Sequence, residues 1–194
     1  MTRFSHGGKG ISAATDLRVI AGKYKGTKLV SPRNSVTHPM GAREKNALFN
    51  MLQPWIADAR VLDAYAGSGA LGIEALSRGA TSVAFVEQQP AVVRILHENL
   101  SRIGVTAEIL AEAVAAVTER TDWQGKFNLI IADPPYDNFQ LSEVEALGEL
   151  LMSSGILALS YPGDLGELEL TGFQLLTARH YAAAGIGIYQ KTML

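Results

Sequence analysis

Short apolar runs alternate with amphipathic segments over most of the chain. Five segments repeat their apolar positions with the spacing of a helix: residues 43–53, 70–78, 90–103, 112–120 and 142–151. Five apolar runs have the length of buried strands: residues 60–65, 81–87, 105–110, 127–132 and 155–161. Because strand and helix alternate regularly from residue 60 onward, the pattern predicts a parallel sheet with right-handed crossovers.

The two ends of the chain depart from this alternation. Near the carboxyl terminus, residues 168–177 and 185–191 read as successive strands and predict an antiparallel hairpin that closes the sheet. Residues 17–21 and 27–30 predict an N-terminal β-hairpin. The expected fold is a Rossmann-like α/β domain, in three parts: a disordered tail at 1–16, a basic hairpin and loop at 17–42, and the main domain at 43–194.

Composition bounds the class of protein. The chain has 194 residues, of which 47% are hydrophobic and 19% charged, as is typical of a globular domain with a substantial core. It contains no cysteine, which excludes disulfides and a cysteine nucleophile and fits a reducing cytoplasm. No apolar run approaches the roughly 18 residues that cross a bilayer, so we expect a cytoplasmic monomer without membrane attachment. No metal is expected, because the histidines are isolated from one another: His6, His38, His97 and His180.

Charge is distributed unevenly along the chain. Residues 1–45 carry nine Lys and Arg against two acidic residues, whereas the remainder carries eight basic against seventeen acidic residues. A basic arm on an acidic body is typical of a protein that places one face on a polyanion. The turn of the N-terminal hairpin displays lysines around a tyrosine, which can bind phosphates and stack on a base. The candidate RNA-binding residues are Arg18, Lys23, Tyr24, Lys25, Lys28 and Arg43.

A glycine turn follows the first strand of the alternation. The chain runs from Asp63 through Gly67 and Gly69 into a helix, and glycines let the backbone turn tightly and approach a ligand closely. Glu87 ends the next strand, where a carboxylate can accept hydrogen bonds from ribose hydroxyls. Together with Gly72, these glycines satisfy the Gly-x-Gly-x-x-Gly fingerprint, so a nicotinamide nucleotide is one interpretation of the turn.

Asp63 favours S-adenosylmethionine over a nicotinamide nucleotide. Its carboxylate lies inside the turn, where it would repel a pyrophosphate but attract the amino-acid end of a sulfonium cofactor. The acidic segment Asp133-Pro134-Pro135-Tyr136, which follows residues 127–132, also has no role in hydride transfer. The candidate cofactor contacts are Asp63, Ala64, Gly67, Ser68, Gly69, Glu87, Gln88 and, for the adenine amino group, Glu112.

The apolar run at 127–132 ends in the acidic turn Asp133-Pro134-Pro135-Tyr136. Two prolines cannot continue a sheet ladder, so the strand stops there and the turn is nearly rigid. Ligands bind at the carboxyl ends of strands in open α/β sheets. The Asp133 carboxylate and the Pro134 carbonyl could accept both N–H groups of an exocyclic amine and aim its lone pair at a methyl group, while Tyr136 stacks on the base. The four residues of the turn are the catalytic candidates, and the base must be single-stranded or flipped out.

These residues by themselves leave the identity of the amine open. Adenine N6, cytosine N4 and protein glutamine nitrogens are methylated with the same kind of turn. A sequence-specific DNA enzyme is disfavoured, because the chain has no large target-recognition domain. From other functional classes, a non-catalytic RNA-binding or assembly module need not bind S-adenosylmethionine, and a nicotinamide oxidoreductase would bind NAD in preference.

Three segments resemble the RsmD family: residues 18–26, 47–50 and 67–80, taken with the acidic turn. The resemblance spans roughly residues 17–190. It implies the fold of a Rossmann-like class I methyltransferase. It also implies S-adenosylmethionine-dependent methylation of a guanine N2 in 16S ribosomal RNA, with the assembled small ribosomal subunit as substrate. It also implies cofactor contacts at Asp63, Gly67, Gly69 and Glu87, and base contacts at residues 133–136.

The chain departs from the family pattern before its first helix. The stretch from His38 to Asn46 keeps Pro39 and Arg43 but lacks the Asp and the leading Arg that the family usually carries. This departure bears on which nucleotide is recognised more than on the reaction.

Overall fold

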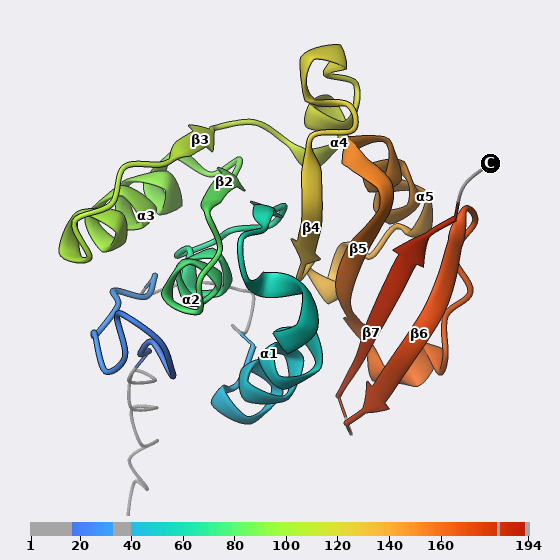
Figure 1. The fold of residues 1–194 in the computed structure, drawn as a ribbon, viewed down its shortest axis with the longest axis horizontal. Coiled ribbons are helices and arrows are strands. Elements are labelled where there is room, and N and C mark those ends of the chain that lie inside the picture. Colours follow the sequence, from blue (N-terminus) through green and yellow to red (C-terminus); the bar gives the residue numbers. More distant parts are fainter. Residues whose placement is uncertain (1–16, 33–39, 182, 193–194) are drawn as a thin grey trace, which may run out of the picture.

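The computed structural model describes residues 17–32, 40–181 and 183–192. Within these ranges the chain forms an α/β domain around a seven-stranded sheet with the strand order β3-β2-β1-β4-β5-β7-β6 (Figure 1). The expected disordered tail at 1–16, and most of the loop that follows the N-terminal hairpin, lie outside the described residues.

The strands confirm the predicted mixed sheet. Strands β1 to β5 pair in parallel, whereas β7 pairs antiparallel with both β5 and β6. Strand β4 has the bounds that the sequence predicts, and β5 begins four residues earlier than the predicted 155. The strands are β1 Arg60–Asp63, β2 Ser82–Val86, β3 Glu108–Leu110, β4 Phe127–Ala132, β5 Leu151–Pro162, β6 Phe173–His180 and β7 Ala184–Lys191.

The helices alternate with the parallel strands as predicted. The α-helices are α1 Ala42–Ile56, α2 Ala70–Ser77, α3 Pro90–Arg102, α4 Val114–Thr118 and α5 Leu141–Ala146. Short 3₁₀ turns are η1 Thr121–Trp123, η2 Tyr136–Asn138, η3 Leu147–Leu150 and η4 Gly163–Leu165. The helix expected over residues 142–151 is therefore α5 followed by η3.

Helix α1 continues past its predicted end at residue 53 and passes through Pro54 to Ile56. A proline inside a helix removes the hydrogen bond to the carbonyl four residues earlier. The cost is offset here by packing, since Ile56 is only 2% exposed and Trp55 packs against the same apolar cluster. Tertiary burial thus overrides the local stop signal.

The sheet is covered on both faces, as alternation along β4 shows. Leu129 and Ile131 face the apolar cluster that contains side chains of α1, α2 and α3. Ile130 and Ala132 face the cluster that contains side chains of α4 and α5 (Figure 1). Because successive strand residues point to opposite faces, a continuously apolar strand is expected only where both faces are buried.

The N-terminal hairpin is confirmed, and it belongs to the core. Arg18 and Lys28 form an antiparallel bridge, and the Val19 amide donates to the Thr27 carbonyl at 3.1 Å. Val19 and Leu29 are buried in the cluster with α1, α2 and α3. The hairpin therefore has a fixed position on the main domain.

Buried polar side chains hold this hairpin against α2. Glu74 is fully buried, and its carboxylate accepts the backbone amides of Ile20 at 2.7 Å and Ala21 at 3.0 Å. The same carboxylate accepts Arg78 Nε at 2.8 Å and lies 3.7 Å from Lys45 Nζ. Burial lowers the pKa of Lys45, and the neighbouring Glu74 charge opposes that effect. Glu74 thus compensates the charges of Lys45 and Arg78 and satisfies two hairpin amides.

Asn99 on α3 makes a second connection, between the hairpin segment and the glycine turn. Its Oδ1 accepts the Val30 amide at 2.7 Å. Its Nδ2 donates to the Val30 carbonyl at 2.9 Å and to the Ser68 carbonyl at 2.8 Å. The side chain is fully buried, so these bonds satisfy an amide that has no access to water.

Replacing Glu74 with Gln is expected to lower the free energy of unfolding by about 3–5 kcal/mol, because the charge that compensates Lys45 and Arg78 is lost from a buried site. The matched control is Glu98→Gln, since Glu98 pairs with Arg102 at the same helical spacing but both side chains are exposed. That control is expected to cost at most about 1 kcal/mol. Urea unfolding of both variants measures the difference, and equal effects would contradict the structural role of Glu74.

Candidate active site

The carboxyl ends of the parallel strands place three carboxylates at one edge of the sheet. Asp63 ends β1, and the register pairs it with Phe85 in β2 and Ile131 in β4. Glu87 and Asp133 each follow two residues after those partners. The sequence motifs that lie far apart in the chain are thereby brought to one site, where parallel sheets bind ligands.

Gly67 and Gly69 are required in the turn for different physical reasons. Gly67 has φ +52° and Gly69 has φ +80°, a region that L side chains rarely adopt. A Cβ on Gly69 would overlap Leu96, whereas a Cβ on Gly67 would meet no atom within 4 Å. Gly69 therefore lets α2 pack onto α3, and Gly67 keeps its turn narrow on a side that is open to a ligand.

Asp63 is buried, with 1% of its surface exposed. Its Oδ2 accepts the Gly72 amide at 2.8 Å, so the carboxylate also anchors the first turn of α2. Burial raises the pKa of Asp63 to about 7; the Gly72 bond opposes this, and the charges of Asp133 and Glu87 add to it. A cation bound at this edge would relieve that repulsion.

Glu87 supports the glycine turn from the next strand. Its Oε2 accepts the Gly67 amide at 3.0 Å, and its Oε1 accepts the Gln89 amide at 2.7 Å. The remaining lone pairs of this partly buried carboxylate are available to donors on a ligand. Its position at the end of β2, twenty residues after Gly67, is the one expected for a ribose contact.

The other candidate cofactor contacts surround this turn. Ala64 is buried, and its amide donates to the Ile131 carbonyl at 2.9 Å. Ser68 is buried, and its backbone carbonyl accepts the hydrogen bond from Asn99 Nδ2. Gln88 is exposed. Glu112 is exposed beyond β3 and forms an ion pair with Arg120 at 3.7 Å. Glu112 stays a prediction for the adenine amino group.

The acidic turn lies beside these carboxylates at the end of β4. Pro134 is buried, and the Asn138 amide donates to the Pro135 carbonyl at 3.2 Å, which closes the turn into η2. Across the part of the chain that the structure describes, no hydrogen bond ends on the Pro134 carbonyl. Tyr136 is 36% exposed, as a platform for a planar ligand requires.

The pKa of Asp133 is raised toward neutral pH. Burial raises the pKa of Asp133 to about 6, and a hydrogen bond from the Ser160 side chain opposes this effect. The Ser160 hydroxyl also shares a short hydrogen bond with the Tyr136 hydroxyl. Ser160 lies at the end of the apolar run at 155–161, and its signal in the sequence is one polar residue in an otherwise apolar strand.

Tyr65 makes a further contact that the sequence did not reveal. Its hydroxyl donates a short hydrogen bond to Glu143 of α5. Burial, the bond itself and the Glu143 charge all raise the pKa of Tyr65. The bond joins the glycine turn to the helix that follows the acidic turn.

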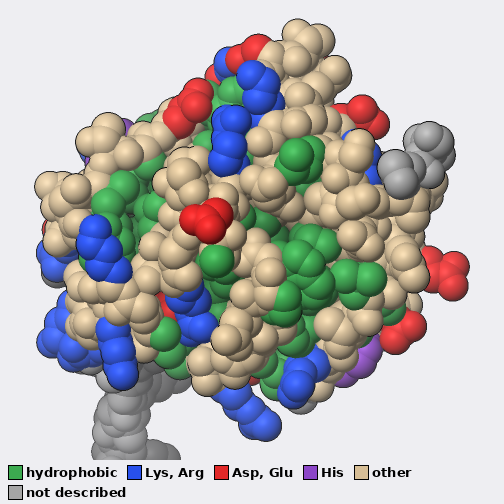
Figure 2. All heavy atoms as spheres, viewed as in Figure 1, with side chains coloured by type: hydrophobic (Ala, Val, Ile, Leu, Met, Phe, Trp, Pro, Cys, Tyr) green, Lys and Arg blue, Asp and Glu red, His purple; other side chains and the backbone are tan. Residues whose placement is uncertain are grey.

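The structure groups the hairpin residues among the candidate RNA contacts and separates Arg43 from them. Lys23 Nζ lies 5.2 Å from the centroid of the Tyr24 ring. Arg43, at the start of α1, instead lies 5.8 Å from the ring of Tyr181 beside the β6–β7 turn. Figure 2 shows Lys and Arg side chains gathered at the hairpin end of the molecule. The exposed basic residues of the hairpin are Arg18, Lys23, Lys25 and Lys28.

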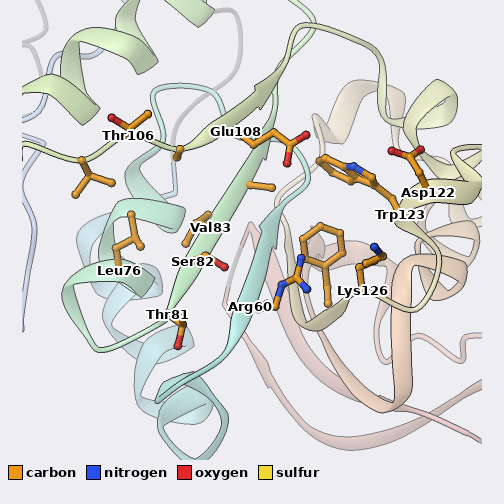
Figure 3. A pocket seen from close by; sticks show the side chains of 14 residues that line it. Arg60, Leu76, Thr81, Ser82, Val83, Thr106, Glu108, Asp122, Trp123 and Lys126 are labelled. Atoms are coloured by element: carbon orange, nitrogen blue, oxygen red, sulfur yellow. The ribbon is translucent and has the colours of Figure 1, made fainter.

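A hollow lies at the opposite edge of the sheet (Figure 3). It has a volume of about 540 Å³ and is lined by Arg60, Ser82 and Phe127, which begin β1, β2 and β4. It is therefore separate from the carboxylates at the strand ends. No helix in the described ranges is long and apolar enough to cross a membrane. The same residues contain no group of three or more His, Asp or Glu side chains arranged to hold a metal.

Comparison with known proteins finds similar sequences and similar solved structures. The protein called ribosomal RNA small subunit methyltransferase D is 36% identical over 135 residues in Haemophilus influenzae, covering 68% of this chain and 69% of that protein. The Escherichia coli K12 protein of the same name is 34% identical over 160 residues, covering 81% and 75%. The solved structure of Escherichia coli yhhF is 27% identical, with a TM-score of 0.81 over 91% of this chain and 98% of that one.

A second solved structure, of a hypothetical protein from Thermus thermophilus, is 32% identical, with a TM-score of 0.74 over 88% of this chain and 97% of that one. The family model described as conserved hypothetical protein 95 matches residues 17–190. This match includes the hairpin, the glycine turn, the acidic turn and the antiparallel strands. The chain therefore belongs to the RsmD family, the methyltransferase family that its sequence resembles.

Proposed function

We propose that this protein transfers a methyl group from S-adenosylmethionine to the exocyclic N2 amine of a guanine in 16S ribosomal RNA. The observation that carries the proposal is the acidic turn. The partly buried Asp133 carboxylate and the Pro134 carbonyl lie together on a rigid turn, beside a glycine turn rich in negative charge. Two acceptors and an exposed ring match an amine on a planar base.

The residues at the sheet edge fit S-adenosylmethionine. Burial leaves Asp63 and Asp133 with raised pKa values, and the charge of Asp133 adds to the shift of Asp63. Such a set of carboxylates favours a cationic ligand and disfavours a pyrophosphate. We assign Asp63 to the amino-acid end, Glu87 to the ribose hydroxyls, and the Gly67–Gly69 turn to the close backbone approach. When bound, S-adenosylmethionine supplies an electrophilic methyl group.

The acidic turn would activate the amine by orientation. Asp133 accepts one N–H of the amine and the Pro134 carbonyl accepts the other, so the nitrogen lone pair is freed from the ring and directed at the methyl group. Tyr136 fixes the plane of the base by stacking. Positioning and matched charge of this kind supply most of the acceleration in many enzymes. As the nitrogen loses a proton, Asp133 is the nearest acceptor.

The choice of ribosomal RNA is supported by the relatives and by the charge pattern. The matched proteins of Haemophilus influenzae and Escherichia coli are named as small-subunit ribosomal RNA methyltransferases. The exposed basic hairpin has a fixed position next to α2 and α3, where it can bind RNA phosphates while the base enters the site. We further propose that the protein acts as a cytoplasmic monomer on RNA within the small subunit.

Product mapping tests this function directly. Small subunits from cells that lack the enzyme should incorporate labelled methyl groups from S-adenosylmethionine, and nuclease digestion should recover N2-methylguanosine at one position. Recovery of N6-methyladenosine would replace guanine by adenine as the target. If a protein that binds the cofactor gives no incorporation into subunits or free RNA, the proposal is wrong.

Asp133→Asn is expected to reduce turnover by about 10²–10³-fold, because an amide cannot serve as the anionic acceptor for the amine. Cofactor binding should persist, since Asp63 and Glu87 remain. Single-turnover methylation and calorimetric cofactor titration separate the two effects. The control is Asp137→Asn, an exposed acid in the same segment, which should keep wild-type turnover. Unchanged turnover in Asp133→Asn would overthrow the assigned role.

Cofactor affinity is expected to fall as the pH drops below about 7. Asp63, with a pKa of about 7, becomes protonated in the free protein, and a cationic ligand must then displace that proton. The loss should reach about tenfold per pH unit for one coupled group. Calorimetric titrations at pH 5.5, 6.5 and 7.5 measure it. Asp63→Asn should bind more weakly at pH 7.5 with a flatter dependence, and a wild-type affinity independent of pH would rule out the coupling.

A further inference from the structure

The guanidinium of Arg43 lies on an aromatic ring instead of on a carboxylate. Arg43 is exposed, and the central carbon of its guanidinium is 5.8 Å from the centroid of the Tyr181 ring. In the part of the chain that the structure describes, the Arg43 side chain makes no hydrogen bond or ion pair. By contrast, the guanidinium groups of Arg78, Arg102 and Arg120 each pair with a carboxylate. The N–H donors of Arg43 are therefore available to a ligand.

The ring under this guanidinium is fixed by the turn between β6 and β7. The Tyr181 amide donates to the Ala184 carbonyl at 2.7 Å, and the Ala184 amide donates back to the Tyr181 carbonyl at 3.3 Å. Tyr181 is partly buried and packs against the apolar cluster that contains side chains of α1, α2 and α3. Because the ring is held, the guanidinium that stacks on it has a defined plane.

The β6–β7 turn lies at the same edge of the sheet as the acidic turn. Ser160, near the end of β5, shares a hydrogen bond with the Tyr136 hydroxyl, and the register pairs Ser160 with Ile186 in β7. Ala184, two residues before Ile186, is the partner of Tyr181. In Figure 1, β6 ends and β7 begins at the end of the sheet toward which β4 points. Tyr181 and the guanidinium on it therefore lie on the β7 side of the acidic turn.

The carboxylate that follows Arg43 in the chain is directed elsewhere. A Cβ on Gly41 would overlap the Glu44 carboxylate, so this side chain folds back over the start of α1. Negative charge is favourable at that end of a helix. Burial raises the pKa of Tyr136, and the charges of Asp133 and Glu44 add smaller contributions, as expected if the first turn of α1 is near the acidic turn.

An exposed planar cation beside a turn that receives a base fits the phosphate of a nucleic-acid backbone. A base that leaves its stack to enter a site brings its flanking phosphates to the entrance of that site. Arginine can bind a phosphate through two parallel N–H donors, and a ring beneath the guanidinium fixes its orientation. The basic hairpin is attached to α2 and α3, whereas Tyr181 follows β6. The two basic groups are thus placed on different sides of the acidic turn.

We propose that Arg43, held on the ring of Tyr181, binds an RNA backbone phosphate next to the target nucleotide, as a second contact apart from the basic hairpin. The inference rests on the proposed function for the identity of the nucleic acid. Tyr181 acts through Arg43 and is a positioning residue. Because a phosphate contact is made before the reaction and persists through it, its loss weakens RNA binding and leaves the rate of the bound complex unchanged.

The binding test measures the affinity of a 16S ribosomal RNA transcript from about 50 to 200 mM salt, with S-adenosylhomocysteine present so that no reaction occurs. Arg43→Gln should weaken binding about tenfold and reduce the slope of log affinity against log salt by about 0.7–0.9, because one phosphate contact is lost. Tyr181→Ala should weaken binding about two- to fivefold, and Tyr181→Phe, which keeps the ring, should bind as the wild type does.

The matched control is Arg60→Gln. Arg60 is an exposed arginine that begins β1 at the opposite edge of the sheet, so its loss should change neither the affinity nor the salt slope. Urea unfolding of each variant shows that it folds, and calorimetric titration shows that it still binds S-adenosylmethionine. An unchanged affinity and salt slope in Arg43→Gln, or an equal loss in Arg60→Gln, would overturn the inference.

Steady-state methylation of small subunits separates this contact from a distortion of the acidic turn. Arg43→Gln should raise the KM for subunits and keep kcat, since binding is lost equally in the ground state and the transition state. A lower kcat with an unchanged KM would instead show a structural effect and contradict the phosphate contact. If RNA affinity and salt slope change as expected but product mapping finds no methylated guanine, the proposed function fails and the contact of Arg43 with RNA stands.

Discussion

Negative charge gathered at the carboxyl edge of the parallel sheet is the constraint on which the rest of the structure depends. Asp63, Glu87 and Asp133 come from three strands that must lie side by side for the sheet to form. Burial, with a smaller contribution from the charges of Asp133 and Glu87, raises the pKa of Asp63 to about 7. Two of these carboxylates are held by backbone donors: the Gly72 amide for Asp63, and the Gly67 and Gln89 amides for Glu87. The fold therefore stabilises a site that a cationic ligand would complete.

The N-terminal hairpin is connected to this edge through polar groups buried in the core. Glu74 compensates Lys45 and Arg78 while it binds two hairpin amides. Asn99 joins Val30 to the carbonyl of Ser68 in the glycine turn. A basic hairpin on a flexible arm could bind RNA in many orientations. A hairpin held by these bonds keeps its basic side chains in one position relative to the glycine turn.

The sequence predicted the features that depend on a few neighbouring residues. The alternation of apolar runs determined the mixed sheet and placed β4 at its observed bounds. Gly67 and Gly69 indicated a tight turn, and both have positive φ. The acidic turn could be placed at the end of a strand, because two prolines interrupt the hydrogen-bond ladder of any sheet. Backbone preferences and periodicity are local properties, so they can be derived without knowledge of the fold.

Tertiary structure decided which buried polar groups meet. Glu74 accepts a hydrogen bond from a backbone amide 54 residues away, and Asn99 accepts one from an amide 69 residues away. The residues around Glu74 and Asn99 in the sequence do not predict these partners. Packing also carried α1 through Pro54 and separated Arg43 from the hairpin. Ser160 lies within an apolar run, and only the pairing of β5 with β4 brings its hydroxyl to the hydroxyl of Tyr136. The sequence by itself determined the elements and the turns that carry chemistry. The contacts that hold and tune those turns arise from segments distant in the chain, since a buried polar atom takes its partner from whatever the packing brings within reach.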